Sequence, residues 1–193
     1  FIRGVYRVWL RYADFEVVEG FLFADLAPGD QGARATSIRE AIRLVERVQP
    51  YRLRQARRYL RRLVVSHTGG SGEYWYGMGV CILDAQYINI SDSTAIAMLL
   101  LHEATHGRLD RWRIRTTRQN VDRVEHLCAR TEIDFALRTP GGASHAERVR
   151  GSLERPWWDS ANSAARQRRR LVQIRLPSWA LRLYDALVGP SQR

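Results

Sequence analysis

Hydrophobic residues recur every three or four positions along most of this chain, and this spacing predicts a mainly helical protein. Helices are expected over residues 37–49, 52–63, 94–112, 120–137 and most of 143–193, with breaks at Pro156 and Pro177. A capping box from Ser37 to Glu40 is expected to begin the first helix, and Ser91–Ser93 and Asn120 offer N-caps to later ones. Residues 1–25 fit both helical and alternating spacing, and we favour a helix there.

Four shorter segments depart from the helical pattern. Residues 80–90 have the composition of a strand, and residues 63–65 are expected to begin another. Residues 26–36 are expected to form a loop, and residues 68–79 form a second loop that is rich in glycine and aromatic residues. The sequence therefore predicts an α+β fold, mainly helical with a small sheet, in a single domain over residues 1–193.

The balance of hydrophobic and charged residues is that of a folded globular domain. Of 193 residues, 45% are hydrophobic and 26% are charged, which is enough to bury a core. No run approaches the roughly 18 consecutive apolar residues that a transmembrane helix needs. All 31 basic side chains are arginine against 20 acidic ones, and the net charge of +11 would attract acidic partners. Because lysine is absent, part of this excess is expected to reflect a GC-rich genome.

The excess of positive charge lies at the two ends of this basic protein. Residues 1–64, a basic helical part, hold 13 arginines and 7 acids. Residues 65–137, which contain the sheet and the central helices, hold 7 arginines and 9 acids. Residues 138–193, a second basic helical part, hold 11 arginines and 4 acids. The middle of the chain is therefore slightly acidic, and the candidate chemistry lies in this part.

The residues His102-Glu103-Ala104-Thr105-His106 form an HExxH motif inside the helix expected over residues 94–112. Residues four apart lie on one helical face, so both imidazoles can bind one metal ion, and the spacing indicates zinc. The same face carries apolar residues and is expected to be buried, where two histidines need partners. Glu103 is rotated by about 100° from His102, which suits a general base that is not itself a ligand.

A third metal ligand is expected on the helix over residues 121–137. At about 100° per residue, Glu125 and Glu132 fall on an otherwise apolar arc about 20° apart, whereas His126 lies on the opposite side. Buried carboxylates need a metal ion or a hydrogen-bond donor, and a salt bridge to one of the many arginines is the alternative. Cys128 lies on the same arc and is expected to pack in the core.

An HExxH motif followed by a glutamate on the next helix resembles the gluzincin class of zinc metallopeptidases (zincins). Eighteen residues separate His106 from Glu125 and six separate Glu125 from Glu132, which is similar to the aminopeptidase N family. The resemblance covers residues 95–135. It implies that His102, His106 and Glu125 bind zinc. It also implies that Glu132 supports the site, although Glu132 is an alternative third ligand.

The stretch His102–Asp110 also resembles the active helix of thermolysin, which implies that Asp110 supports His106 or serves as an alternative ligand. In zincins, an edge strand of a small antiparallel sheet precedes the active helix and binds extended peptide, and residues 80–90 are expected to take this place. The GxMEN motif of the aminopeptidases is absent. The resemblance therefore implies a minimal zincin domain, without aminopeptidase specificity.

The expected activity is that of a zinc metalloprotease, a hydrolase of peptide bonds in a peptide or protein substrate. Glu103 would act as the general base for a water molecule bound by zinc and would pass the proton to the leaving nitrogen. A second donor often stabilises the transition state. Tyr184 lies at roughly the sequence distance from the motif at which the gluzincin resemblance implies a tyrosine or histidine donor, although we favour an ordinary core tyrosine there. Tyr74, Tyr76 and His145 are further candidates.

Other functions are weighed against this one. The run Arg166–Arg170 and the helix over residues 52–62 are candidates for binding nucleic acid, although we favour solvated arginine faces as their explanation. A SprT-like protease acting on DNA-linked protein shares the motif and the basic charge, but its third ligand is a histidine, which the position of His126 disfavours. A zinc-binding domain without activity is the last alternative, and it has no need of Glu103.

Cellular location is only weakly indicated by the sequence. Two cysteines, Cys81 and Cys128, are too few for a disulfide framework, which favours a reducing compartment such as the cytoplasm. Phe1 is not an initiator methionine, so we expect preceding residues, in which an export signal or anchor has room to lie.

Overall fold

The computed structural model describes residue 10 and residues 13–154 of the chain. Tyr184, the run Arg166–Arg170 and the breaks expected at Pro156 and Pro177 lie outside these residues. The HExxH motif and every candidate zinc ligand lie within them.

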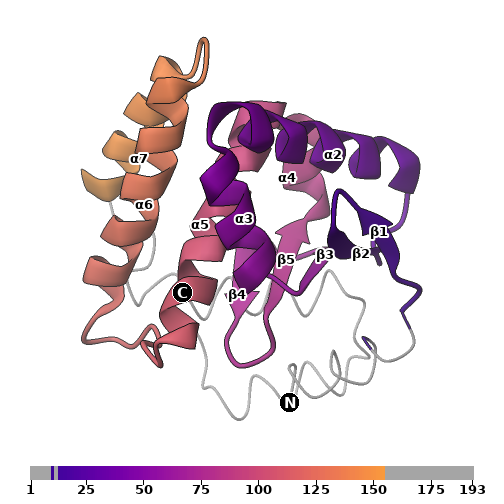
Figure 1. The fold of residues 1–193 in the computed structure, drawn as a ribbon, viewed down its shortest axis with the longest axis horizontal. Helices are drawn as coiled ribbons and strands as arrows, with labels where there is room; N and C mark the ends of the chain where they lie inside the picture. Colours follow the sequence, from indigo (N-terminus) through magenta and orange to yellow (C-terminus); the bar gives the residue numbers. More distant parts are fainter. Residues whose placement is uncertain (1–9, 11–12, 155–193) are drawn as a thin grey trace, which may run out of the picture.

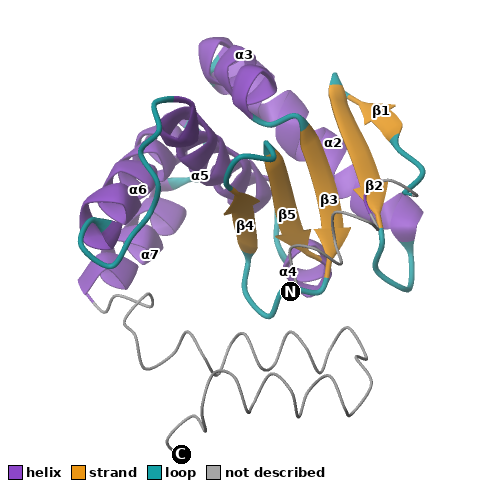
Figure 2. Ribbon diagram, turned by 90° about the horizontal axis from the view of Figure 1, so that it is seen from below, coloured by secondary structure: helices purple, strands orange, loops and turns teal. Residues whose placement is uncertain are grey.

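A mixed five-stranded sheet forms the centre of the described fold (Figure 2). Its strands are β1 (Glu16–Val18), β2 (Phe21–Asp25), β3 (Arg62–Ser66), β4 (Gly72–Trp75) and β5 (Val80–Asp84). They lie in the order β1-β2-β3-β5-β4, with β2, β3 and β5 parallel and the edge strands β1 and β4 antiparallel to their neighbours. The expected antiparallel sheet is therefore wrong, because a helical connection returns the chain across the sheet between β2 and β3 and makes them parallel.

Helices cover one face of the sheet and continue beyond its β4 edge (Figures 1 and 2). They are α2 (Gln31–Val48), α3 (Pro50–Tyr59), α4 (Ala85–Ile90), α5 (Ser93–Arg111), α6 (Val121–Arg138) and α7 (Ala143–Glu154). α5 packs against α2, α3 and β4, α6 packs on α5, and α7 packs on α6. The predicted α+β class, mainly helical with a small sheet, is confirmed.

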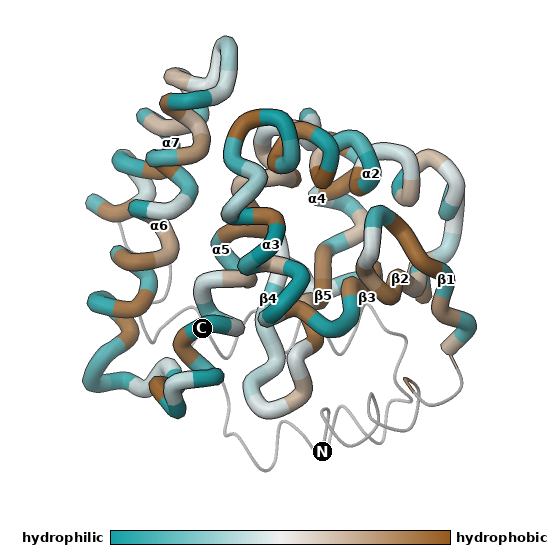
Figure 3. Tube along the Cα trace, viewed as in Figure 1, coloured by the Kyte–Doolittle hydropathy of each residue, from teal (hydrophilic) through white to brown (hydrophobic). Residues whose placement is uncertain are grey.

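The central strands are buried on both faces, and the hydropathy of the chain follows this burial (Figure 3). Leu63 and Val65 of β3 join the main core beneath the helices, whereas Val64 between them joins a smaller cluster on the opposite face. β5 divides in the same way, with Cys81 in the main core and Ile82 in the smaller cluster. This alternation fixes the register of the sheet, because a shift by one residue would exchange the two faces.

The helix favoured over residues 1–25 is wrong for residues 16–25, which form the β1–β2 hairpin. Within β2, Phe21 and Phe23 are buried and Leu22 between them is exposed, which is the alternation of a strand. The turn between the strands places Glu19 at φ 46° and Gly20 at φ 82°, in the left-handed region that glycine adopts freely.

Three helix boundaries differ by two or more residues from the sequence prediction. The helix expected to end at residue 63 ends at Tyr59, because β3 begins at Arg62. α2 begins at Gln31, because the side chain of Asp30 accepts a hydrogen bond from the backbone N–H of Ala33. The expected cap, Ser37, lies within the helix and donates to the carbonyl of Ala33. Pro50 is the first residue of α3, where its missing N–H costs nothing.

The strand predicted over residues 80–90 ends at Asp84, whose carboxylate accepts from the backbone N–H groups of Gln86 and Tyr87 and begins α4. β4 lies inside the segment expected to be a loop. The edge strand beside α5 is therefore β4 and not the segment 80–90, because β5 lies between β3 and β4. By contrast, the predicted helices of the motif and the third ligand agree with α5 and α6 within one residue at each end.

No helix among the described residues combines the length and the apolar character needed to cross a membrane.

Gly107, directly after the motif, lets α5 approach α3 and β4 closely. A Cβ atom at this position would lie 3.0 Å from Cβ of Tyr59, 3.2 Å from the carbonyl oxygen of Tyr59 and 3.2 Å from the ring of Tyr74. Since one of these neighbours is backbone, rotation of a side chain does not relieve the contact.

We expect Gly107→Ala to lower the free energy of unfolding by about 1–3 kcal/mol, the usual cost of overpacking. Gly151→Ala on α7 is the matched control, because no described atom lies within 4 Å of its added Cβ. Gly151→Ala should stabilise by up to about 1 kcal/mol through helix propensity. Urea unfolding of both variants measures the difference, and equal effects would contradict the close approach.

Candidate metal centre

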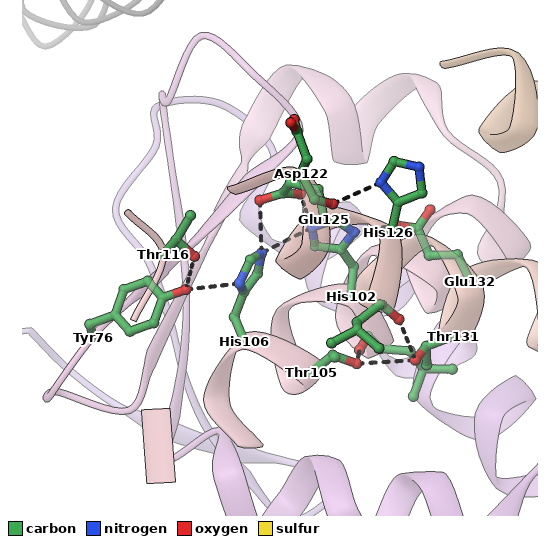
Figure 4. A network of polar contacts seen from close by, with 12 residues as sticks. Tyr76, His102, Thr105, His106, Thr116, Asp122, Glu125, His126, Thr131 and Glu132 are labelled. Carbon is green, nitrogen blue, oxygen red and sulfur yellow. Dashed lines mark hydrogen bonds and ion pairs between the residues drawn. The ribbon is translucent and has the colours of Figure 1, made fainter. Parts of the chain in front are cut away.

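The two histidines of the HExxH motif project from α5 into its interface with α6 (Figure 4). They are one helical turn apart, and their Nε2 atoms lie 3.2 Å from each other. Helix α5 is enclosed by other elements, and His106 is only 7% exposed. Because the two Nε2 atoms lie in the interior and close to each other, they need a partner that both can bind.

Glu125 of α6 brings a carboxylate to the same point, as its place on the apolar arc predicted. Glu125 is 5% exposed. One of its oxygens lies 3.3 Å from Nε2 of His102, and the other lies 3.5 Å from Nε2 of His106. In a tetrahedral zinc site with bonds of about 2.0–2.1 Å, neighbouring ligand atoms are about 3.3 Å apart. The spacing of these three side chains therefore fits a zinc ion.

The Nδ1 atom of each imidazole is hydrogen-bonded to a different residue. The carboxylate of Glu132 accepts a hydrogen bond from Nδ1 of His102. The hydroxyl of Tyr76 lies 2.9 Å from Nδ1 of His106 and is also hydrogen-bonded to the hydroxyl of Thr116. Both Nδ1 atoms are engaged, so both Nε2 atoms are left to face Glu125. Glu132 therefore occupies the place of a supporting residue and not that of a ligand.

Asp110 hydrogen-bonds Tyr74 and Gly77, whereas Nδ1 of His106 is hydrogen-bonded to Tyr76, in contrast to the support of His106 by Asp110 that the thermolysin resemblance implied. The carboxylate of Asp110 accepts from the hydroxyl of Tyr74 at 3.0 Å and from the backbone N–H of Gly77 at 2.6 Å. Asp110 thus fastens β4 and its following turn to the end of α5. Sequence reasoning considered Tyr76 only as a transition-state donor, and it missed Thr116, because neither residue has a spacing signal that links it to the motif.

Glu103 is 3% exposed and lines the same cleft as the two histidines. Its Oε2 atom has no hydrogen-bond partner among the described residues. Burial raises the pKa of Glu103 to about 8, although the charge of His102 acts in the opposite direction. A carboxylate with a free oxygen and a pKa near neutrality is suited to exchange protons in the cleft.

Two of the three proposed ligands have protonation states that suit metal binding, and His102 is the exception. Burial would lower the pKa of His102, but the neighbouring Cys128, Glu132 and Glu125 outweigh it and hold that pKa well above its usual value, so metal binding at His102 has to displace a proton. Burial lowers the pKa of His106 to about 4, and the charge of His102 adds to this shift, so the imidazole of His106 is neutral at pH 7. Burial would raise the pKa of Glu125, but the hydrogen bond and charge of His102 outweigh it and the pKa is lowered. A neutral imidazole and an ionised carboxylate are the forms that coordinate a metal ion.

Cys128 also lies near the two histidines. Its sulfur and one nitrogen of each imidazole are all within 4.8 Å of one another. Burial raises the pKa of the Cys128 thiol to about 12, so the sulfur is protonated unless a metal ion binds it. Cys128 packs with Leu109 and Val124 in a small apolar cluster, which agrees with the expected core position.

An open cleft of about 580 Å³ lies over these residues. On one side it is bordered by the beginning of β4, with Gly72 and Glu73. On the other side it is bordered by α7, with Arg148 and Val149. The HExxH side chains and Glu125 are therefore reachable from solvent through a space large enough for a peptide segment.

Other candidates lie away from this cleft. His126 is exposed, and its Nδ1 lies 2.7 Å from the carbonyl of Asp122. Nε2 of His145 lies 3.1 Å from the carboxylate of Asp92, which caps the start of α5. Tyr184 is outside the described residues.

Comparison with models of protein families, with curated proteins and with solved structures finds no match to this chain. The function is therefore argued from the geometry of the centre alone.

Proposed function

We propose that this protein is a zinc-dependent peptidase in which His102, His106 and Glu125 hold the metal. The observation that carries the proposal is the set of distances of 3.2, 3.3 and 3.5 Å that join the two Nε2 atoms and the Glu125 carboxylate. The unpartnered Oε2 atom of Glu103 beside this set supplies a base that is not needed as a ligand. Only three protein ligands are assigned, so a position is open, which distinguishes a catalytic site from a closed structural one.

Each residue has a defined task in hydrolysis. Bound zinc would polarise the substrate carbonyl and lower the pKa of a water molecule to about 7. Glu103 accepts the proton of the attacking water and delivers it to the leaving nitrogen. Glu132 and Tyr76 hold the rings of His102 and His106 in the orientation that ligation requires.

A peptide is the substrate class that the cleft supports best. β4 pairs with β5 on one side only, and in the described residues it is an edge strand. Residues 72–74 of β4 line the cleft beside the HExxH side chains. An extended peptide can add to such an edge through backbone hydrogen bonds, which places its carbonyl groups along the cleft.

A closed, structural zinc site is the competing function, and the position of Cys128 favours it. With Cys128 as a fourth ligand, His102, His106 and Glu125 would leave no open position. The packing of Cys128 in an apolar cluster with Leu109 and Val124 argues against this arrangement. Separate substitutions of Glu103 and Cys128 distinguish the two functions.

Glu103→Gln should retain zinc and lose hydrolysis. The amide keeps the size of the side chain but cannot accept a proton, and general-base catalysis contributes about 10²–10⁴-fold to the rate. The measurement is cleavage of a generic unfolded protein by zinc-loaded wild type and variant, together with their zinc content. Equal inertness of the two zinc-loaded proteins would contradict a peptidase.

Glu125→Gln should weaken zinc binding far more than Cys128→Ala, because only the first substitution removes a proposed ligand. Zinc affinity is measured by competition with a chelator of known affinity, and thermal unfolding in the presence of EDTA checks that both apo-proteins fold. Zinc loss in Cys128→Ala with retention in Glu125→Gln would assign the third position to the cysteine.

Tyr76→Phe should lower zinc affinity by about 10–100-fold, the usual effect of removing the partner of a ligating histidine. Tyr74→Phe is the matched control, because its hydroxyl bonds Asp110 and not a histidine. The visible spectrum of the cobalt-substituted proteins reports the ligand field directly. The same zinc affinity in the two variants would refute a role of Tyr76 in orienting His106.

A further inference from the structure

Unpaired arginines gather on the segment that joins α5 to α6. From Arg111 to Arg123, the exposed arginines are Arg111, Arg113, Arg115, Arg118 and Arg123. None of the five forms an ion pair with a described residue, whereas Arg34, Arg43 and Arg52 elsewhere do. Asp110, the acid at the start of this segment, is already engaged by Tyr74 and Gly77. The positive charge of this segment is therefore available to a partner.

This segment is held at the rim of the cleft. Asn120 accepts from the backbone N–H of Thr117 at 2.7 Å and donates to the carbonyl of Arg115 at 3.0 Å, which fixes the shape of the turn. Thr116 lines the cleft and bonds Tyr76. The guanidinium of Arg115 lies over the β4–β5 turn, 4.0 Å from where a Cβ of Gly77 would be.

A second unpaired cation borders the cleft from the opposite element. Arg148 of α7 lines the cleft, is exposed and forms no ion pair with a described residue. Its charge acts on the phenol of Tyr87, which lines the same cleft, although burial is the larger influence on the pKa of that phenol and raises it. The cleft thus has cationic groups at two sides, on the α5–α6 segment and on α7.

The floor of the cleft is lined by negatively charged groups, and this charge favours a polypeptide over a nucleic acid as the bound polymer. Glu103, Glu125 and Glu132 line the floor, and Glu73 adds a carboxylate where β4 borders the cleft. A nucleic acid that spans the two cationic rims would pass its continuous phosphate charge over these carboxylates. A polypeptide can place neutral backbone over the floor and acidic side chains at the rims. Two exposed apolar side chains on the same segment, Trp112 and Ile114, add surface for a polypeptide.

We infer that the cleft selects polypeptide segments that carry carboxylates on both sides of the cleaved bond, with Arg115 and Arg148 as specificity-determining residues. This inference rests on the proposed peptidase function. It adds a substrate class to it, since neither arginine lies in the metal centre. Electrostatic attraction of this kind raises local substrate concentration and association rates.

The test uses three quenched fluorescent peptides with the same central sequence and with flanks of glutamate, glutamine or lysine, blocked at both ends. For the zinc-loaded protein at low salt, kcat/KM should be about tenfold higher for the glutamate peptide than for the glutamine peptide. The difference should shrink at 1 M salt, where the Debye length is about 3 Å. An unblocked glutamine peptide separates a terminal carboxylate from side-chain carboxylates as the group recognised.

Matched double variants assign the effect to the rims. Arg115→Gln with Arg148→Gln should abolish the preference. Arg47→Gln with Arg54→Gln should keep it, because these exposed arginines lie on α2 and α3, away from both the cleft lining and the α5–α6 segment, and the change in net charge is the same. Thermal unfolding checks that both double variants fold.

A binding measurement separates failure of this inference from failure of the proposed function. The anisotropy of a labelled glutamate peptide is followed with Glu103→Gln, which does not need to cleave it. Binding that depends on Arg115 and Arg148 without hydrolysis by wild type would support the rims and overturn the peptidase. Equal cleavage of all three peptides by wild type would support the peptidase and overturn the role of the rims. Rim-dependent binding of a single-stranded oligonucleotide, with no binding of the glutamate peptide, would overturn the inference.

Discussion

The burial of ionisable side chains between α5 and α6 is the constraint on which the rest of the structure depends. Two imidazoles and the carboxylate of Glu125 are withdrawn from water within about one helical turn. Charged groups in such a place are costly unless they compensate one another or share a cation. The close packing of α6 on α5 therefore depends on how these ionisable groups compensate one another. The same packing brings their nitrogen and oxygen atoms to the spacing of metal ligands.

The support behind the two histidines is unequal, and this inequality follows from the fold. His102 is backed by Glu132 of the same helix that supplies Glu125, so one element fixes both. His106 is backed by Tyr76, which follows β4, and through it by Thr116 of the α5–α6 segment. The second histidine is thus connected to the two loops that border the cleft, whereas the first is connected to the helical core.

The cleft has negatively charged groups at its floor and positively charged groups at its rims. Carboxylates at the floor surround the metal position, and unpaired arginines border it on α7 and on the α5–α6 segment. The net charge of the chain is a poor guide to this arrangement, because most of the arginines among the described residues lie outside the cleft lining and the α5–α6 segment. What matters is that neither Arg115 nor Arg148 forms an ion pair with a described residue at the border of the cleft.

The sequence by itself determined the features that depend on local spacing. Residues four apart share a helical face, so HExxH placed His102 and His106 together, and the arc of α6 placed Glu125 and Glu132 toward α5. Only the tertiary structure decided the parallel pairing of the sheet, the edge position of β4 and the partner of His106. These depend on contacts between segments far apart in the chain, and no periodicity within one segment records which distant hydroxyl or strand it meets.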